Sequence, residues 1–186
     1  TVYVLFCLMW GVNYWMDSFQ DRAGITAQPV TETELEAVTR YFAEQLTAAA
    51  DSVPRDENGL YAVPKVQILE ESTAVYGGVT ELYPFLRFRD TGVKAVRCSR
   101  LMSIMGFTGV YFSCIGESNV NVDSPACLLP STIAHELAHQ RGIAWEQECN
   151  FLGVLASVTS GLPDYAYSGW LLGFIHLGNA LYDTDP

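Results

Sequence analysis

The sequence feature that most constrains the fold is the pattern His-Glu-x-x-His at His135, Glu136 and His139. Residues four apart on an α-helix are displaced by about 40° in rotation and about 6 Å in rise, so both imidazoles project from one face. The chain contains only three histidines. Average composition would place this pattern in roughly one random chain of this length in two hundred. The pattern therefore predicts a helix that binds one cation with two imidazoles.

The flanking residues give this helix two ends. Ser131 follows Pro130 and is a candidate N-cap, and Gly142 is a candidate stop just after the helix. Glu136 projects beside the two histidines, where it can take a proton from water and pass it to a leaving amine. We therefore expect Zn²⁺ as the cofactor and Glu136 as the general base.

A catalytic zinc site usually has three protein ligands and an open fourth position. The next segment offers Glu146 and Glu148 at the start of a new helix. Glu146 is the preferred ligand, because Asn150 then lies one turn later on the same face and can hydrogen-bond a ligand histidine. Glu148 lies on a different face and is expected to be a solvated surface acid. His176, a lone histidine in an apolar helix, is expected to be a core residue, with a ligand role as the alternative.

Elsewhere the chain predicts a mainly helical α+β protein. Thr31 and Glu34 form a capping box that opens a helix over residues 32–50. A short helical stretch should stop near Gly77 and Gly78, and two or three strands are expected within residues 93–122, with a hairpin near Met105. Two further helices are expected over residues 144–159 and 165–182. The last is uncharged, and we interpret it as a closely packed core helix rather than a membrane span.

Substrate-binding residues are less well defined by the sequence. Metallopeptidases commonly bind peptides as an added strand at a sheet edge, and residues 107–122 are the candidate segment. Glu117, Asn119 and Asn121 are candidate cleft residues, with turn formation as the alternative. Tyr165 and Tyr167 are candidate oxyanion donors, with core packing as the expected role of each.

The N-terminal segment indicates a membrane neighbour. Residues 1–16 carry no charge and end in aromatic residues, which is typical of the outer end of a spanning helix; a buried core helix is the alternative. Asp17 and Asp21 follow it in place of Lys or Arg, so residues 17–186 are expected to form one extracytoplasmic domain at the cell membrane. The formal net charge of −11 argues against nucleic acid and against an anionic membrane surface as partners.

Several runs of the sequence together resemble one bacterial membrane family, domain-of-unknown-function family 3810. They are GVNYW at residues 11–15, FTGVYF followed by GESNVNV at residues 107–122, HELAHQRGIAWEQECNF at residues 135–151 and YSGW at residues 167–170. The resemblance covers nearly the whole chain in order. It implies several membrane helices, the last of which ends at residues 1–16, followed by a gluzincin-like zinc domain.

The shorter pattern E-x-x-C-N from Glu146 to Asn150 is similar to E-x-x-A-N in other gluzincin-type enzymes, where the first glutamate is the third zinc ligand. Cys149 replaces the usual alanine, which should preserve packing. The prediction is thus a zincin-like fold with a small sheet over the zinc helix. Its function would be that of a membrane-anchored metallopeptidase, which hydrolyses peptide bonds with zinc-activated water. A non-catalytic zinc-binding membrane sensor or scaffold, and a hydrolase of another amide, are the alternatives.

Overall fold

Helices make up most of the chain, of which the computed structural model describes residues 2–184. The α-helices are α1 (Val2–Met9), α2 (Phe19–Ala23), α3 (Glu32–Ala50), α4 (Lys65–Glu71), α5 (Gly77–Leu82), α6 (Ser99–Ile104), α7 (Leu129–Gln140), α8 (Glu146–Thr159) and α9 (Pro163–Thr184). Short 3₁₀ helices are η1 (Gly11–Trp15), η2 (Ser72–Ala74), η3 (Pro84–Leu86) and η4 (Ala126–Leu128). The strands are β1 (Lys94–Ala95), β2 (Gly109–Phe112) and β3 (Glu117–Val120). The predicted α+β class is confirmed, with helices predominating.

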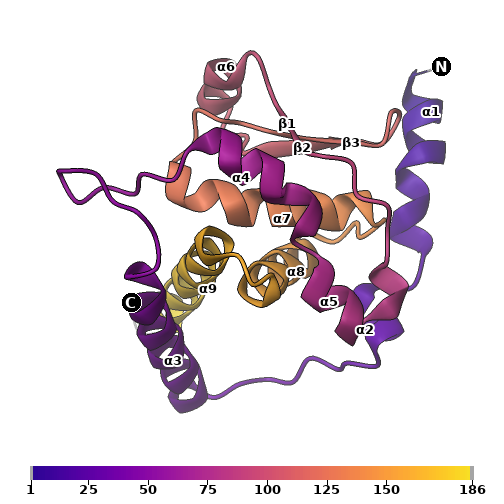
Figure 1. The fold of residues 1–186 in the computed structure, drawn as a ribbon. Helices are drawn as coiled ribbons and strands as arrows, with labels where there is room; N and C mark the ends of the chain where they lie inside the picture. The colour runs from indigo at the N-terminus through magenta and orange to yellow at the C-terminus, as the bar shows by residue number, and fades with distance from the viewer. Residues whose placement is uncertain (1, 185–186) are drawn as a thin grey trace.

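The strands form one small mixed sheet in the order β1-β3-β2. β1 runs parallel to β3, and β2 runs antiparallel to β3, with Gly109 opposite Val120. The sheet lies over α7 (Figure 1), where the hydroxyl of Ser118 donates to the carbonyl oxygen of Glu136 at 3.1 Å. β2 is therefore an edge strand of this sheet, and it runs beside the helix that carries the His-Glu-x-x-His pattern.

The long helices pack on the other side of α7 (Figure 1). Ile133 and Leu137 of α7 and Leu152 of α8 are fully buried between them. α9 lies so close to α3 that a Cβ atom at Gly173 would meet the ring of Phe42 at 2.3 Å. The predicted close packing of the last helix is confirmed for its first half, because its buried residues lie between positions 164 and 173.

The second half of α9 is open to solvent, which corrects one prediction. His176 is exposed rather than buried in the core.

The predicted capping box of the helix at residues 32–50 is confirmed: the Thr31 side chain accepts from the backbone N–H of Glu34, and the Glu34 carboxylate accepts from the backbone N–H of Thr31. The local sequence thus defines the start of α3. Burial along α9, in contrast, depends on which other helices pack against it.

Three local boundaries differ from the predictions. α7 begins at Leu129, so Ser131 lies inside the first turn and its hydroxyl donates to the carbonyl of Leu128. The hairpin turn occupies residues 113–116 between β2 and β3, whereas Met105 follows the short helix α6. Gly77 begins α5 instead of ending a helix. α5 and α6 have six residues each, which is too short for helical periodicity to mark their bounds in the sequence.

The apolar N-terminal segment forms α1 and then η1. Most large apolar side chains of α1 are exposed, from Met9 at 42% to Tyr3 at 77%. None of the helices within residues 2–184 has both the length and the apolar character needed to cross a bilayer. Ser18 and Asp21 then form a capping box at the start of α2, which returns the chain to the core through buried Phe19.

Candidate metal centre

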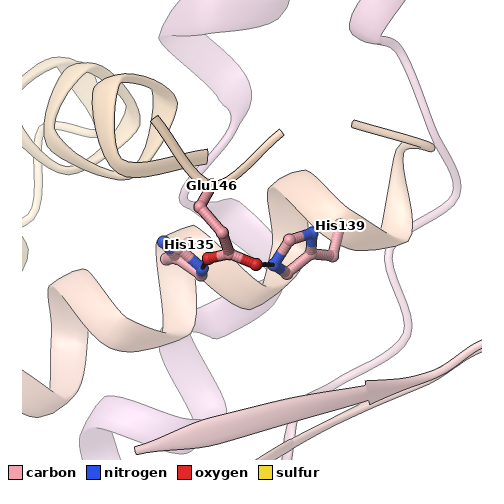
Figure 2. Close-up of side chains that lie close together, drawn as sticks. All are labelled: His135, His139 and Glu146. Atoms are coloured by element: carbon pink, nitrogen blue, oxygen red, sulfur yellow. Dashed lines mark ion pairs between the residues drawn. The ribbon is translucent and has the colours of Figure 1, made fainter. Parts of the chain in front are cut away.

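The metal-binding candidates come from the ends of two consecutive helices. α7 presents His135 and His139 one turn apart, with ring centroids separated by 4.9 Å. Gly142 follows this helix with φ +84°, a left-handed conformation that glycine adopts without a Cβ penalty. The turn that it permits lets α8 begin at Glu146 and brings this residue over the two imidazoles (Figure 2).

The three side chains converge on one point. Glu146 places one carboxylate oxygen 3.3 Å from Nε2 of His135 and the other 3.4 Å from Nε2 of His139. One potential ligand atom from each of the three residues lies within 4.8 Å of the others. Figure 2 shows the carboxylate between the two rings. The structure thus brings together His135, His139 and Glu146, a group that can hold a metal ion.

The hydrogen bonds of the outer ring nitrogens define what the inner ones offer. Nδ1 of His139 lies 2.8 Å from the carbonyl oxygen of Ile143, and Nδ1 of His135 lies 2.9 Å from Oδ1 of Asn150. Both partners are acceptors, so each Nδ1 carries the proton and each Nε2 presents a lone pair toward Glu146. The contact between Asn150 and a histidine is the one that the spacing predicts.

This arrangement contains lone pairs and a carboxylate but no proton between them. Three acceptors facing one another are stabilised by a cation at their centre. Burial, and then the neighbouring His139, lowers the pKa of His135 below its ordinary value, which favours the neutral form that binds metals. Two imidazole nitrogens with one carboxylate are the donor set of many catalytic zinc sites. The residues present therefore fit a zinc ion.

Cys149 is the nearest sulfur, with Sγ 3.3 Å from Nδ1 of His139. It is fully buried in α8. Burial, and then the charge of Glu146, raises the pKa of this thiol, so the group stays neutral and packs as a small apolar side chain. It does not compete with the carboxylate as a ligand.

Glu136 lies beside the ligand group and against the sheet. Its side chain is buried, and its Oε2 atom has no hydrogen-bond partner among the described residues. A Cβ atom at Gly109 would fall 2.3 Å from Oε1 of Glu136, so the carboxylate occupies space that only glycine leaves open on β2. Burial, and then the nearby Glu146, raises the pKa of Glu136 to about 8.

Glu148 corrects a prediction, because it is buried at 4% exposure and is not a solvated surface acid. Its carboxylate accepts from the backbone N–H of Phe19 at 3.0 Å and of Gln20 at 3.1 Å. Glu148, which lies two residues after Glu146, therefore links the start of α2 to α8. Its role is structural, and it does not face the histidines.

A cleft of about 620 Å³ runs along the ligand group and β2. One wall is the β2 backbone with Gly109 and Tyr111, and another consists of Trp10 and Tyr14. The Trp10 ring lies 5.3 Å from the Tyr111 ring and 5.5 Å from the His139 ring. Gly109 and Tyr111 lie within residues 107–122, the segment that the sequence predicts as the peptide-binding strand. No cleft role was predicted for Trp10 and Tyr14, whose only signal is an aromatic character that is equally common in cores.

Other sequence candidates lie away from the cleft. The Tyr165 hydroxyl donates to the carbonyl of Ile68 in the core, and Tyr167 stacks on Tyr61, so both have the expected packing role. Asn121 is buried and holds the chain near Phe107 by its side-chain amide. Glu117 pairs with Lys94, and Asn119 lies on the central strand. His176 is not among the grouped ligands.

The comparisons with known proteins support one conclusion about relationship. The family model described as "Protein of unknown function (DUF3810)" matches residues 1–186. The comparison with curated proteins and that with solved structures gave no match. Because the family match spans the full sequence and includes both helices of the candidate metal centre, the chain belongs to the DUF3810 family of proteins of unknown function.

Proposed function

We propose that this protein is a membrane-anchored zinc metallopeptidase with a gluzincin-like site. His135, His139 and Glu146 would hold the zinc ion, and Glu136 would act as the general base. The observation that carries the proposal is the convergence of the unprotonated Nε2 atoms of two histidines and the carboxylate of Glu146, beside the buried Glu136. A bound zinc ion would supply Lewis acidity, which polarises a carbonyl group and lowers the pKa of water.

The chain's own residues supply the remaining chemistry. Glu136 is buried next to the cleft and has an unpartnered oxygen, so it can take a proton from water and deliver it to the leaving nitrogen of an amide. Asn150 and the carbonyl of Ile143 hold the two imidazoles in one tautomer and orientation. Gly109 leaves room for the Glu136 carboxylate beside the strand.

A peptide is the substrate class that the cleft favours. β2 is an edge strand, and its residues line the cleft beside the ligand group. An edge strand offers backbone N–H and C=O groups to an added strand, which fixes an extended peptide across the site. The sheet above α7 and the helices below it agree with the zincin-like arrangement, which is part of this proposal.

Membrane attachment is supported by the N-terminal segment. The exposed apolar side chains of α1 and η1 include Leu8 at 69% and Trp15 at 91%. Burial of such a surface in lipid removes apolar area from water. The acidic residues Asp17 and Asp21 directly after this segment favour placement of the domain outside the cytoplasm at the cell membrane.

Zinc content by elemental analysis is the first test. We expect about one zinc per chain, lost in His139→Ala and Glu146→Ala. His176→Ala is the matched control, because this exposed histidine lies outside the ligand group. Absence of zinc from the unaltered protein after metal is supplied would overturn the proposal, as would equal loss in the His176 variant.

Peptide hydrolysis is the second test, and it separates the enzyme from a zinc-binding sensor or scaffold. The zinc-loaded protein and its Glu136→Gln variant are incubated with a peptide library, and products are identified by mass spectrometry. Cleavage by the parent alone supports the enzyme. Full zinc occupancy with identical, background-level products from both proteins would favour the non-catalytic alternative.

A further inference from the structure

Charge is distributed unevenly along this acidic chain. Residues 94–116 contain three basic residues and no acid, which gives the segment a charge of +3, while the rest carries seven basic residues and 21 acids, a charge of −14. Arg97 and Arg100 are exposed, and neither forms an ion pair with another described residue. Lys94 pairs with Glu117, so the basic groups of this segment without an ionic partner among the described residues are Arg97 and Arg100.

The same segment exposes large apolar side chains. Ile104 is 78% exposed and Ile115 is 65% exposed. Their exposed neighbours are Leu101, Met105, Phe107 and Phe112. Single exposed apolar residues are common on soluble proteins, but so many within one segment mark an interaction surface.

Part of this segment lies on the side of the sheet away from α7. Residues opposite each other on β2 and β3 share a face, and Gly109 and Ser118 contact Glu136 on the α7 side. Successive side chains of a strand point to opposite faces, so the Phe112 side chain lies on the face of the sheet away from α7. Figure 1 shows α6 and the sheet on one side of α7, α3 and α9 on the opposite side, and α1 beside one end of the sheet and of α7. We call the exposed side chains of Arg97, Arg100, Leu101, Ile104, Met105, Phe112 and Ile115 the outer face.

We propose that the outer face binds the surface of an anionic lipid bilayer. Arginines meet lipid phosphates, while the isoleucine and phenylalanine side chains enter the boundary between headgroups and acyl chains. The same combination favours lipid over nucleic acid, because a nucleic-acid surface offers no apolar layer for aliphatic side chains. The exposed apolar α1 lies beside one end of the sheet, so a bilayer that meets the outer face could meet α1 at its margin. This inference does not depend on the metal or on catalysis.

Vesicle binding of the full chain tests the inference. The affinity for phosphatidylglycerol-containing vesicles is compared with that for pure phosphatidylcholine vesicles. Because α1 is expected to bind both kinds of vesicle, the ratio of the two affinities measures the contribution of the basic side chains. The double variant Arg97→Gln, Arg100→Gln should lose the anionic preference by roughly tenfold to thirtyfold, since each juxtamembrane arginine adds about 1 kcal/mol. The matched control is Arg40→Gln, Arg55→Gln, which neutralises two exposed arginines elsewhere.

A second pair of variants tests the apolar component. Ile104→Ser with Ile115→Ser should weaken binding to both vesicle types. Leu60→Ser with Val66→Ser, at positions that are 64% and 62% exposed, should not. Far-UV circular dichroism checks that each variant is folded. An unchanged anionic preference in the folded arginine variant would overturn the inference. Arginine-dependent binding to a DNA oligonucleotide without vesicle binding would also overturn it.

Discussion

The two sides of α7 differ in the pairing of their polar groups and in the exposure of their apolar side chains. On the α8 side, polar atoms are paired: the outer nitrogens of both histidines have acceptors, and the carboxylate of Glu148 accepts from the backbone at the start of α2. On the sheet side, arginines and large apolar side chains such as Ile104 are left in solvent. The difference teaches that paired polar atoms hold the side chains of one side in fixed positions, whereas the other side leaves its charged and apolar groups accessible, which is the basis of the bilayer contact that we propose.

Glu136→Gln gives the largest effect that this comparison predicts. The variant keeps the shape of the buried side chain but cannot accept a proton, so peptide hydrolysis should fall by roughly 10²–10⁴-fold. Zinc content should stay near that of the parent, because Glu136 is not a proposed ligand. Hydrolysis rates on the peptides found by library screening provide the measurement. Near-parental activity would remove Glu136 from the proposed chemistry.

Gly109→Ala tests the point where the sheet touches the site. The added Cβ would meet the Glu136 carboxylate at 2.3 Å, so this side chain must move and hydrolysis should fall by about tenfold to a hundredfold with zinc retained. Gly92→Ala is the control, since its Cβ would meet nothing within 4 Å. Equal activities of the two variants would show that the sheet does not position the base.

Glu148→Ala probes the buried polar links of the α8 side. It leaves one buried and one partly buried backbone N–H group at the start of α2 without an acceptor, which should lower the free energy of unfolding by about 2 kcal/mol. Urea denaturation measures the loss. Gln147→Ala, at an exposed neighbouring position, should stay within about 0.5 kcal/mol. Similar losses in both variants would contradict the assigned role.

Asp164 gives the smallest expected effect, and it depends on pH. Burial, and then the charge of Glu71, raises the pKa of Asp164 to about 6 from an ordinary 3.8. The folded state therefore holds the proton more tightly, and stability should decline as pH rises through this range. In Asp164→Asn this decline should be smaller by about 1 kcal/mol between pH 4.5 and pH 8, as measured by urea denaturation. Parallel pH profiles would contradict the assignment.

The locally coded parts of the fold were predictable from the sequence. The capping box at Thr31 and Glu34, the stop at Gly142 and the face shared by Glu146 and Asn150 all depend on spacings of three or four residues. Such spacings fix geometry through the helical repeat itself. The α+β class followed from the same periodicities.

Other predictions failed where distant segments meet. Glu148 was predicted to be a surface acid, but α2 packs against α8 and buries it. A hairpin turn was predicted near Met105, but this residue follows the helix α6. Trp10 has no sequence signal of its own that marks it as part of the cleft wall. No short-range pattern marks these contacts, because their partners are far away in sequence.

The sequence by itself determined that two histidines and a glutamate share one helix and that a second helix follows a glycine turn. Only the tertiary structure decided that Glu146 lies over both imidazoles, that Gly109 makes room for Glu136, and that the basic outer face is left uncovered. The physical reason is that helical geometry is set by neighbours within one turn, whereas burial and exposure are set by the packing of whole elements.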